Sequence, residues 1–231
     1  MRFKPIVLII GILFGVILFL PTVASASDDF LNIKSLQIIP GTEKSYINNK
    51  NFFKLEFIDD FTGLSIDLNK WMYVPSHWWQ SDVLNIDGGY GIGMTKLNFK
   101  DFYYEGDFKM STEKDFAEAS LVFRAEDQGN LYMAQILPYS NSWKPNHFVI
   151  YSRRDNSFYG LAYIPIKKNI YKGEWYHFGI KAEDNQFEFY IDGDLQGKWT
   201  DENIEYLGAG FIGIRQFFTI SSYDNIKIWS R

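Results

Sequence analysis

The chain has 231 residues, with 23 Lys or Arg against 28 Asp or Glu, so its net charge is −5. This length is ample for one hydrophobic core and short for two. The acidic balance, and the lack of any Lys/Arg cluster, exclude a surface that tracks a nucleic-acid backbone. Aromatic residues make up 19% of the chain, a composition that favours strands and supplies stacking surfaces.

The N-terminus is typical of an export signal. Arg2 and Lys4 precede an uncharged apolar run that ends at Leu20, and the small residues Ala-Ser-Ala follow at 24–26. We predict a signal peptide over residues 1–26 that is cleaved after Ala26, and a secreted or cell-surface protein. The alternative is a retained membrane anchor, because the run is close to bilayer-spanning length. A membrane contact is expected only in that case.

The chain contains no cysteine, which excludes disulfides and a cysteine-borne lipid anchor. After export, stability must therefore come from burial alone. Removing Arg2 and Lys4 with the signal leaves 21 basic and 28 acidic residues, a net charge of −7. Nucleic acid is therefore not an expected partner of the mature protein.

Beyond the signal, the chain divides into a lead-in and one domain. Residues 27–52 are a polar lead-in segment or linker with one candidate edge strand at 33–39. From 53 to 231, apolar residues recur with a period of two, the spacing of strands that bury one face. The clearest runs of this alternation are residues 102–110, 121–124, 187–191, 212–215 and 226–229.

Short turn signals separate these runs. Asp192-Gly193 tolerates the positive φ that a tight hairpin needs, and Asp184-Asn185 and Gly129-Asn130 occupy similar places. No long window shows helical periodicity. The pattern predicts an all-β fold, a sandwich or barrel of antiparallel strands. Such a sheet buries one face and leaves the other to water or ligand.

Several short segments, taken in order, carry a resemblance to a known superfamily. They are residues 57–63 (Phe-Ile-Asp-Asp-Phe-Thr-Gly), 69–71, 121–127, 129–132, 173–176, 190–193, 213–215 and 223–226. The set resembles the concanavalin A-like lectin/glucanase superfamily, and within it the laminin G-like jelly rolls of 3-keto-disaccharide hydrolase domains. The levan-binding carbohydrate-binding modules look related. The resemblance spans 53–229 and implies a two-sheet antiparallel jelly-roll sandwich, a fold that hosts binders, enzymes and adhesion domains alike.

The resemblance also suggests where catalytic carboxylates would lie. Family-16 glucanases of this fold carry a Glu-x-Asp-x-x-Glu strand, whose outer carboxylates share one sheet face. The predicted strands lack this spacing; Glu183-Asp184 with Glu188 comes nearest and falls on a predicted turn. His177 alternates within a strand, as a structural or surface residue does. The sequence thus argues against hydrolysis by the known route and names no catalytic residue.

Tryptophans outside the alternating core are candidates for sugar contact, because the C–H faces of sugars pack on aromatic rings. Trp78 and Trp79 are adjacent, so at least one of them must be exposed or lie in a loop. Trp143 lies in Pro-Tyr-Ser-Asn-Ser-Trp-Lys-Pro, a predicted loop. We expect its ring either to contact ligand or to cap the edge of the core.

Three arginines, Arg124, Arg153 and Arg215, fall out of phase with the apolar residues of their strands. We expect them to project from an outer sheet face, the concave one that family members use for ligand, where guanidinium groups suit sugar hydroxyls. In the levan-binding modules an arginine at the place of Arg124 resembles a ligand contact, with Asp127 and Gln135 as its nearest polar partners here. The alternatives are a buried polar network for Arg124, a solvated turn for Asp127, and weak surface ion pairs for the other arginines.

The resemblance further implies a structural calcium ion. Family-16 enzymes bind calcium through an Asp of the last strand and backbone oxygens near the first. Residues 223–226 resemble that last strand and nominate Asp224, and Asp59 and Asp60 would supply a first-strand partner by position. Calcium prefers hard oxygen ligands and would link the two chain ends. Alternatively, Asp224 caps a turn.

These observations predict a secreted carbohydrate-binding jelly-roll domain that recognises an extracellular glycan. Two other functions stay open at this point. One is a glycoside hydrolase of the 3-keto-disaccharide type that uses Arg124 and groups near Asp127. The other is a laminin G-like adhesion domain that recognises protein.

Overall fold

The computed structural model describes residues 54–113, 116–202 and 208–231, which form two antiparallel β-sheets and no helix. The predicted all-β, two-sheet sandwich is therefore confirmed. The predicted signal peptide, the lead-in segment and the candidate strand at 33–39 lie outside the described residues. Within those that are described, no helix has the length and apolar character needed to cross a bilayer.

Sheet A has eight strands in the order β13-β12-β11-β6-β15-β4-β3, and β1 pairs with β15 beside this path. The last strand, β15, lies next to β6 on one side and next to β1 and β4 on the other. The strands of sheet A are β1 (Lys54–Asp59), β3 (Trp78–Gln80), β4 (Leu84–Asp87), β6 (Phe102–Met110), β11 (Trp175–Glu183), β12 (Gln186–Ile191), β13 (Asp194–Thr200) and β15 (Ile220–Ser230).

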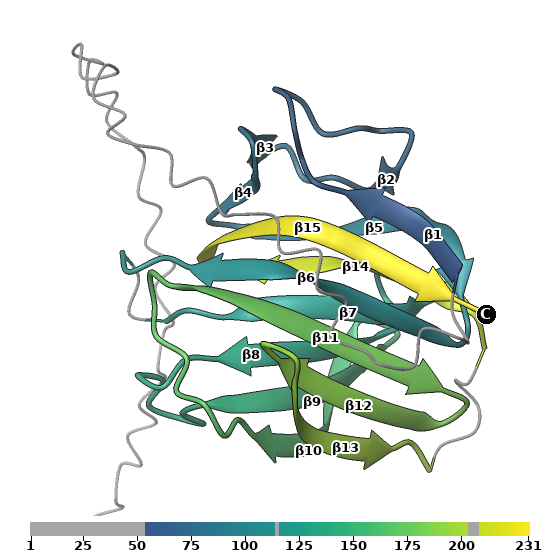
Figure 1. Cartoon of the computed structure of the whole chain (residues 1–231), viewed down its shortest axis with the longest axis vertical. Coiled ribbons are helices and arrows are strands. Elements are labelled where there is room, and N and C mark those ends of the chain that lie inside the picture. The colour runs from purple at the N-terminus through teal and green to yellow at the C-terminus, as the bar shows by residue number, and fades with distance from the viewer. Residues whose placement is uncertain (1–53, 114–115, 203–207) are drawn as a thin grey trace, which may run out of the picture. The chain divides into compact units, whose positions relative to one another are not determined.

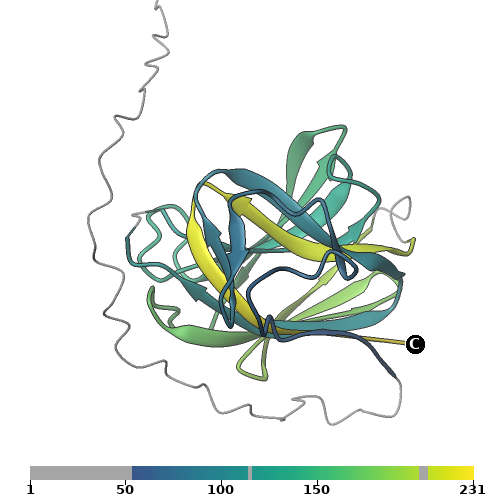
Figure 2. The ribbon, with the colours of Figure 1, turned by 90° about the horizontal axis from the view of Figure 1, so that it is seen from above.

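Sheet B has seven strands in the order β10-β9-β8-β7-β14-β5-β2 and lies behind sheet A in Figure 1. Figure 2 shows the same sandwich from above, with the two layers of strands facing each other. The strands of sheet B are β2 (Trp71–Met72), β5 (Tyr90–Phe99), β7 (Ala119–Ala125), β8 (Leu131–Leu137), β9 (His147–Arg154), β10 (Ser157–Pro165) and β14 (Gly210–Phe217).

The main core fills the space between the sheets and follows the predicted alternation. On β6, Phe102, Tyr104 and Phe108 point inward and are fully buried. On the neighbouring strand β11, the ring of Phe178 lies 5.0 Å from that of Tyr104, edge to face. Each fully buried aromatic or aliphatic side chain of this kind stabilises the fold by about 1.5–3 kcal/mol relative to its exposed state.

The predicted hairpin turns also form. Asp184 joins β11 to β12 with a φ of 48°, and Asp192 and Gly193 join β12 to β13 with φ of 48° and 84°. Two successive positive φ values match the right-handed twist of the strands that such a hairpin connects. Asp192 and Gly193 are residues that adopt this conformation at low cost.

A second apolar cluster lies on the outer face of sheet B, the face turned away from sheet A. Its buried members come from three strands, β5, β7 and β8: Ile92, Met94, Val122, Ala125, Leu131 and Met133. The β7–β8 turn is tied to β5, because Gln128 Nε2 donates a hydrogen bond of 3.1 Å to the Ile92 carbonyl. Part of this outer face is therefore packed by the chain itself, and the polar positions lie beside that packed part.

Candidate functional site

Strand register brings residues far apart in sequence into one row on the outer face of sheet B. Arg215 on β14 stands opposite Ser120 on β7, and Ser120 stands opposite Gln135 on β8. The row continues from Gln135 to Val149 on β9 and from Val149 to Tyr163 on β10. Five strands thus place their side chains side by side on this face.

A buried ion pair occupies one end of the row. Arg215 Nη1 lies 3.2 Å from Glu118 Oε1, and both side chains are almost completely buried. Glu118 also accepts hydrogen bonds from Ser120 Oγ (2.8 Å) and Gln135 Nε2 (2.7 Å). Burial raises the pKa of Glu118, against the lowering influence of Arg215 and these two donors. A buried pair is held well only when such extra hydrogen bonds satisfy it.

Aromatic rings enclose the Arg215 guanidinium. Its central carbon lies 5.5 Å from the ring centroid of Tyr90, 5.2 Å from that of Phe158 and 4.8 Å from that of Phe217. Arg153 on β9 lies over the Tyr90 and Phe158 rings as well, at 5.5 and 5.2 Å. A cation within about 6 Å of a ring face is attracted by the ring quadrupole, so these rings and guanidinium groups hold one another in place.

Both arginines keep one donor without an acceptor. The Nε atoms of Arg153 and Arg215 are buried and have no hydrogen-bond partner among the described residues. The other nitrogens of Arg153 are occupied: Nη1 donates to the Tyr90 hydroxyl and to the Gln128 carbonyl, and Nη2 donates to Asn156 Oδ1. A buried donor left unpaired costs about 1–3 kcal/mol.

Half-exposed rings lie above and beside the ion pair. We call Tyr90, Trp143, Phe158, Tyr163 and Phe217 the outer-face aromatic set; their exposed fractions run from 39% to 54%. The Trp143 ring stands edge-on to Tyr163 at 5.9 Å, and Lys144 Nζ lies 4.3 Å from the Tyr163 ring centroid. The set presents flat apolar faces beside charged and hydroxyl groups, the combination that packs against sugar rings.

Comparison with known proteins assigns the family. A model described as the 3-keto-alpha-glucoside-1,2-lyase-like domain matches residues 56–229. The chain belongs to this family. No curated protein matches this lyase-like domain in sequence.

Solved structures resemble the lyase-like domain in fold. A carbohydrate-binding module, CBM66 from Bacillus subtilis, is 19% identical with a TM-score of 0.55, covering 69% of this chain and 95% of its own. β-Agarase A in complex with oligoagarose is 15% identical with a TM-score of 0.63, covering 82% and 98%. Endo-β-1,3-glucanase from Pyrococcus furiosus is 14% identical with a TM-score of 0.55, covering 77% and 94%. The fold is thus the concanavalin A-like jelly roll of carbohydrate-binding and glucanase domains.

The lyase-like domain brings several of the predicted residues together. Arg153 and Arg215 lie on the outer face of sheet B, as their phase within the strands predicts. Gln135 lies on the same face, but it donates to Glu118 and is not the predicted partner of Arg124. Trp143 lies at the edge of that face, in contact with Tyr163. Sequence reasoning missed the rings of the aromatic set other than Trp143. It also missed Glu118, whose partner Arg215 lies 97 residues further along the chain.

The prediction that Arg124 projects from an outer sheet face was wrong, because its side chain points into the interior of the sandwich. Its φ of 47° turns the side chain into the interior, where its guanidinium lies 5.0 Å from the ring centroid of the core residue Phe187. Nη2 donates to the Lys100 carbonyl at 3.0 Å and lies 3.8 Å from Asp101 Oδ1. The cause is a register shift where β7 meets β14, which interrupts the alternation of faces. Arg124 is therefore buried, as the alternative expected, but only its Nη2 is hydrogen-bonded; Nε and Nη1 have no partner among the described residues.

Three other candidates lie apart from this site. Asp127 is in the β7–β8 turn and accepts hydrogen bonds from the backbone of Gly129 and Asn130, so it has the turn role given as its alternative. Trp78 is buried and Trp79 is 47% exposed, which confirms that the two cannot both point inward. Both belong to β3 of sheet A, so neither lies on the outer face of sheet B.

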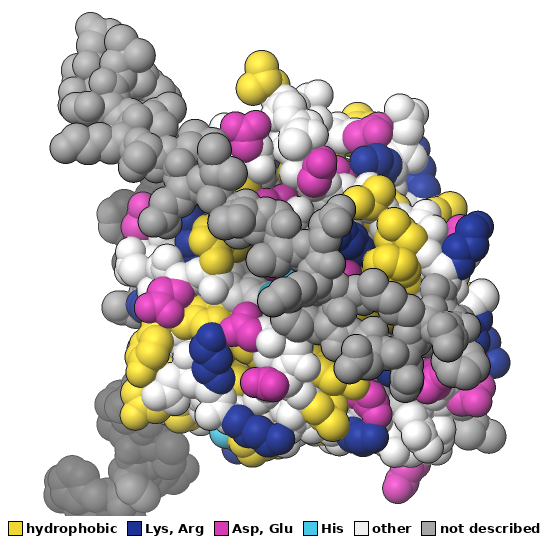
Figure 3. All heavy atoms as spheres, viewed as in Figure 1, with side chains coloured by type: hydrophobic (Ala, Val, Ile, Leu, Met, Phe, Trp, Pro, Cys, Tyr) yellow, Lys and Arg dark blue, Asp and Glu magenta, His cyan; other side chains and the backbone are white. Residues whose placement is uncertain are grey.

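Sheet A carries a separate polar network on its own outer face. His177 Nδ1 lies 2.7 Å from Asp107 Oδ1 and its Nε2 lies 3.4 Å from Glu105 Oε2. Trp229 Nε1 donates to Glu105, and Asn225 Nδ2 donates to Asp107. Burial opposes the charged imidazole, but the hydrogen bonds and charges of Asp107 and Glu105 outweigh it and raise the pKa of His177 to about 9. Figure 3 shows this side of the domain, where acidic and basic side chains are interspersed.

The predicted calcium ligands, Asp224 and Asp60, carry the oxygen atoms that calcium prefers, but two side chains alone do not fill its coordination shell. Burial raises the pKa of Asp224 to about 7, and the charges of Asp107, Asp60 and Asp59 add to this effect. Such crowded carboxyl oxygens suit a hard cation. Asp59, however, already accepts from Trp71 Nε1 and the Phe61 amide. Over the described ranges, no group of three or more His, Cys, Asp or Glu side chains is arranged to hold a metal, so backbone oxygens would have to complete the site.

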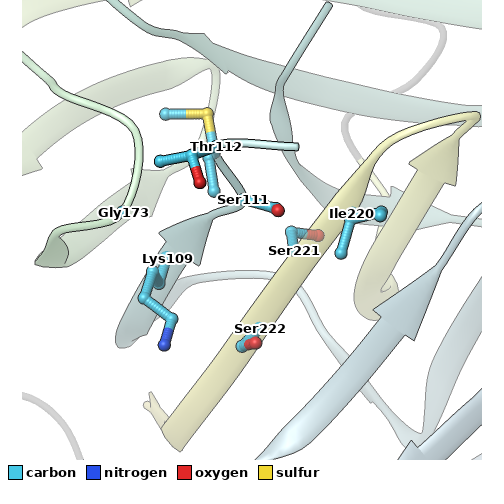
Figure 4. Close-up of a pocket in the computed structure, with 8 residues that line it drawn as sticks. Lys109, Ser111, Thr112, Gly173, Ile220, Ser221 and Ser222 are labelled. Atoms are coloured by element: carbon cyan, nitrogen blue, oxygen red, sulfur yellow. The ribbon is translucent and has the colours of Figure 1, made fainter. Parts of the chain in front are cut away.

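An open pocket of about 280 Å³ lies where β6 ends and β15 begins, bordered by the loop before β11. Figure 4 shows Lys109 and the hydroxyl side chains of Ser111, Thr112 and Ser222 around it. Lys109 Nζ lies over the Trp175 ring at 5.0 Å. None of the predicted site residues lines this pocket, which belongs to sheet A and is separate from the outer-face aromatic set.

Proposed function

We propose that the lyase-like domain is an exported protein that binds an extracellular glycan on the outer face of sheet B, with no covalent step. The observation that carries this proposal is the outer-face aromatic set, three of whose half-exposed rings (Tyr90, Phe158 and Phe217) surround the guanidinium of the buried Arg215–Glu118 pair. Flat rings pack on the C–H faces of sugars, and fixed donors and acceptors orient the hydroxyls.

The electrostatics of this face support a polar oxygen-rich ligand. Arg153 and Arg215 place guanidinium groups on this face, and Lys144 lies beside Tyr163. Glu118 balances Arg215, and the charge of Asp127 interacts with Arg153. Sugar hydroxyls, which accept as well as donate, match this set of donors better than an apolar ligand does.

Calorimetric titration of the full chain tests the proposal. Levan, laminarin, xylan and agar oligosaccharides form the panel, and we expect saturable binding to at least one of them. Phe158→Ala and Tyr163→Ala should each weaken that binding about threefold to tenfold, since one aromatic contact contributes about 0.5–1.5 kcal/mol. Trp79→Ala is the matched control, because it removes an exposed aromatic ring from sheet A and should leave the affinity unchanged. Flat titrations across the panel would refute binding.

A second candidate function follows from the family itself, whose description names a 3-keto-alpha-glucoside-1,2-lyase. In such an elimination, a base takes the C2 proton that the C3 ketone acidifies, and the C1–O bond breaks to leave a C1=C2 double bond. Glu118 is the carboxylate on the outer face of sheet B that would serve as base. Both of its oxygens are hydrogen-bonded and its side chain is 1% exposed, which disfavours this role.

An absorbance assay distinguishes the two functions. A 3-keto-alpha-glucoside incubated with the full chain should show no growth of enone absorbance if the domain only binds. Growth that Glu118→Gln abolishes, with the fold of the variant verified by circular dichroism, would establish the lyase with Glu118 as its base and displace the binding proposal. Turnover that survives Glu118→Gln would assign the base to another residue.

We further propose that a structural calcium ion binds Asp224 and Asp60 and is completed by backbone oxygens. The support is the raised pKa of Asp224, about 7, which burial causes first and the charges of Asp107, Asp60 and Asp59 increase further. A cation would relieve the repulsion among these carboxylates. Calcium should raise the thermal midpoint of the full chain relative to a chelator, and Asp224→Asn should remove that difference. An identical midpoint with calcium and with chelator would reject the site.

Export is tested directly at the N-terminus. If residues 1–26 are a cleaved signal, the protein recovered outside the producing cells should begin at Ser27. Recovery in the membrane fraction with Met1 intact would instead support the retained anchor.

A further inference from the structure

Two hairpin turns at one end of the sandwich are hydrogen-bonded to each other. The Gly88 amide, between β4 and β5, donates to the Thr219 carbonyl at 3.0 Å. The Phe218 amide, between β14 and β15, donates to the Gly89 carbonyl at 2.6 Å. The two turns therefore form one tip, which presents the side chain of Phe218.

Phe218 is an unusual residue for this place. Its φ is 51°, a left-handed conformation that a bulky side chain adopts only at a cost in free energy. Its side chain is also 61% exposed, so burial in the core does not offset that cost. A strained residue that presents a large apolar ring to solvent points to a contact outside the chain.

The Phe218 ring continues the outer-face aromatic set. It stands edge-on to Phe217 at 5.1 Å, and Phe217 stands edge-on to Tyr90 at 6.4 Å. Phe217 in turn lies 4.8 Å from the Arg215 guanidinium. A row of ring faces therefore leads from the buried ion pair to the tip.

We infer that Phe218 is an outer subsite that stacks a further sugar unit of a glycan chain whose other units contact the outer-face aromatic set. The inference rests on the proposed glycan binding and adds that the ligand is a chain rather than a single sugar. Phe217 contacts both the Arg215 guanidinium and the Phe218 ring. A glycan chain that binds beside Arg215 would therefore extend across Phe218, and for this reason we assign a sugar unit of the same chain to Phe218.

Other occupants fit this tip less well. Asp87 is the exposed charged residue at the tip, and residues 87–90 and 217–220 include no Lys or Arg. An anionic membrane surface attracts basic residues rather than an acid. A protein interface of ordinary stability buries about 800 Å² on each partner, which is far more than one small cluster of rings presents.

The test compares ligand lengths in the full chain. Laminari-oligosaccharides of two to six units are the probe, with the matching levan, xylan and agar series as further arms. Phe218→Asn removes the ring but keeps a residue that accepts a positive φ, so the fold should hold, as a thermal midpoint will verify. We expect this variant to bind the longer oligomers about threefold to tenfold more weakly and the shortest ones as the wild type does. Phe218→Tyr keeps an aromatic ring, so its affinity should rise with oligosaccharide length as that of the wild type does.

The outcomes separate this inference from the proposed function. Equal affinities of wild type and Phe218→Asn at every length would overturn the subsite and leave glycan binding intact. Absence of wild-type binding in every series would overturn both. Loss of binding to anionic vesicles in Phe218→Asn, with glycan affinities unchanged, would assign the tip to membranes. Leu64→Asn, which removes another highly exposed apolar side chain, should behave as the wild type throughout.

Discussion

The histidine network on sheet A gives a quantitative prediction for stability against pH. Asp107 and Glu105 raise the pKa of His177 to about 9 in the folded protein, whereas an unfolded chain has a histidine pKa of about 6.5. The folded state binds this proton more tightly. Its contribution to the free energy of unfolding is therefore fully present below pH 6.5 and is lost as the pH rises through 9.

The size of this effect follows from the two pKa values. A pKa difference of one corresponds to about 1.36 kcal/mol, so the difference between 6.5 and about 9 corresponds to about 3 kcal/mol. The side chain is 18% exposed, so solvent screens the charges only in part. Glu105 and Asp107 on β6 are the charged groups that face the ring, and the His177 amide bonds Asp192.

Urea unfolding of the wild type and of His177→Gln, from pH 6 to pH 10, measures this contribution. The variant lacks the titrating ring, so groups common to both proteins cancel in the difference between their free energies of unfolding. That difference should shrink by about 3 kcal/mol between pH 6 and pH 10. A difference that stays constant across the range would refute the reasoning, as would an imidazole that titrates at 6.5 or below in the folded protein.

Three further changes test other parts of the structure. Glu118→Gln leaves the buried Arg215 without its carboxylate and should lower the free energy of unfolding by about 3–5 kcal/mol; an unchanged urea midpoint would contradict the buried pair. Gly213→Ala places a Cβ 2.2 Å from the Gly93 carbonyl oxygen and should lower the free energy of unfolding by about 1–3 kcal/mol. An unchanged urea midpoint would show that β14 and β5 move apart easily at this point. Asp224 has a raised pKa, so its ionisation weakens the fold as the pH rises from about 4 through 7. In chelator, Asp224→Asn should therefore be more stable than the wild type above pH 7, and equal stabilities would count against the crowded carboxylates.

The alternation of apolar residues predicted much of the fold because it is a local property. The run 102–110 became β6, and Asp192-Gly193 became the turn between β12 and β13. Each depends on neighbours within a few residues, since a strand that buries one face must alternate and a tight hairpin must tolerate positive φ. Such features need no knowledge of which strands pair.

The site depends on pairing over long distances, and there the sequence was less informative. Glu118 and Arg215 meet although they are 97 positions apart in the sequence, so nothing local marked Glu118 as the partner of Arg215. Phase alone placed Arg215 on the outer face, but it failed for Arg124, because the register shift where β7 meets β14 reverses the face of a side chain. Phe158 contacts Arg215 only through the order of strands in sheet B.

The central claim is that the outer face of sheet B binds glycan. One glycan array probed with the full chain and with a Phe158→Ala/Tyr163→Ala double variant tests it most directly, with circular dichroism to verify the fold of both. The structure predicts that the wild type binds a defined subset of glycans and that the double variant loses those signals. Equal signals from the two proteins would place the binding surface elsewhere, and no signal from either would contradict glycan binding itself.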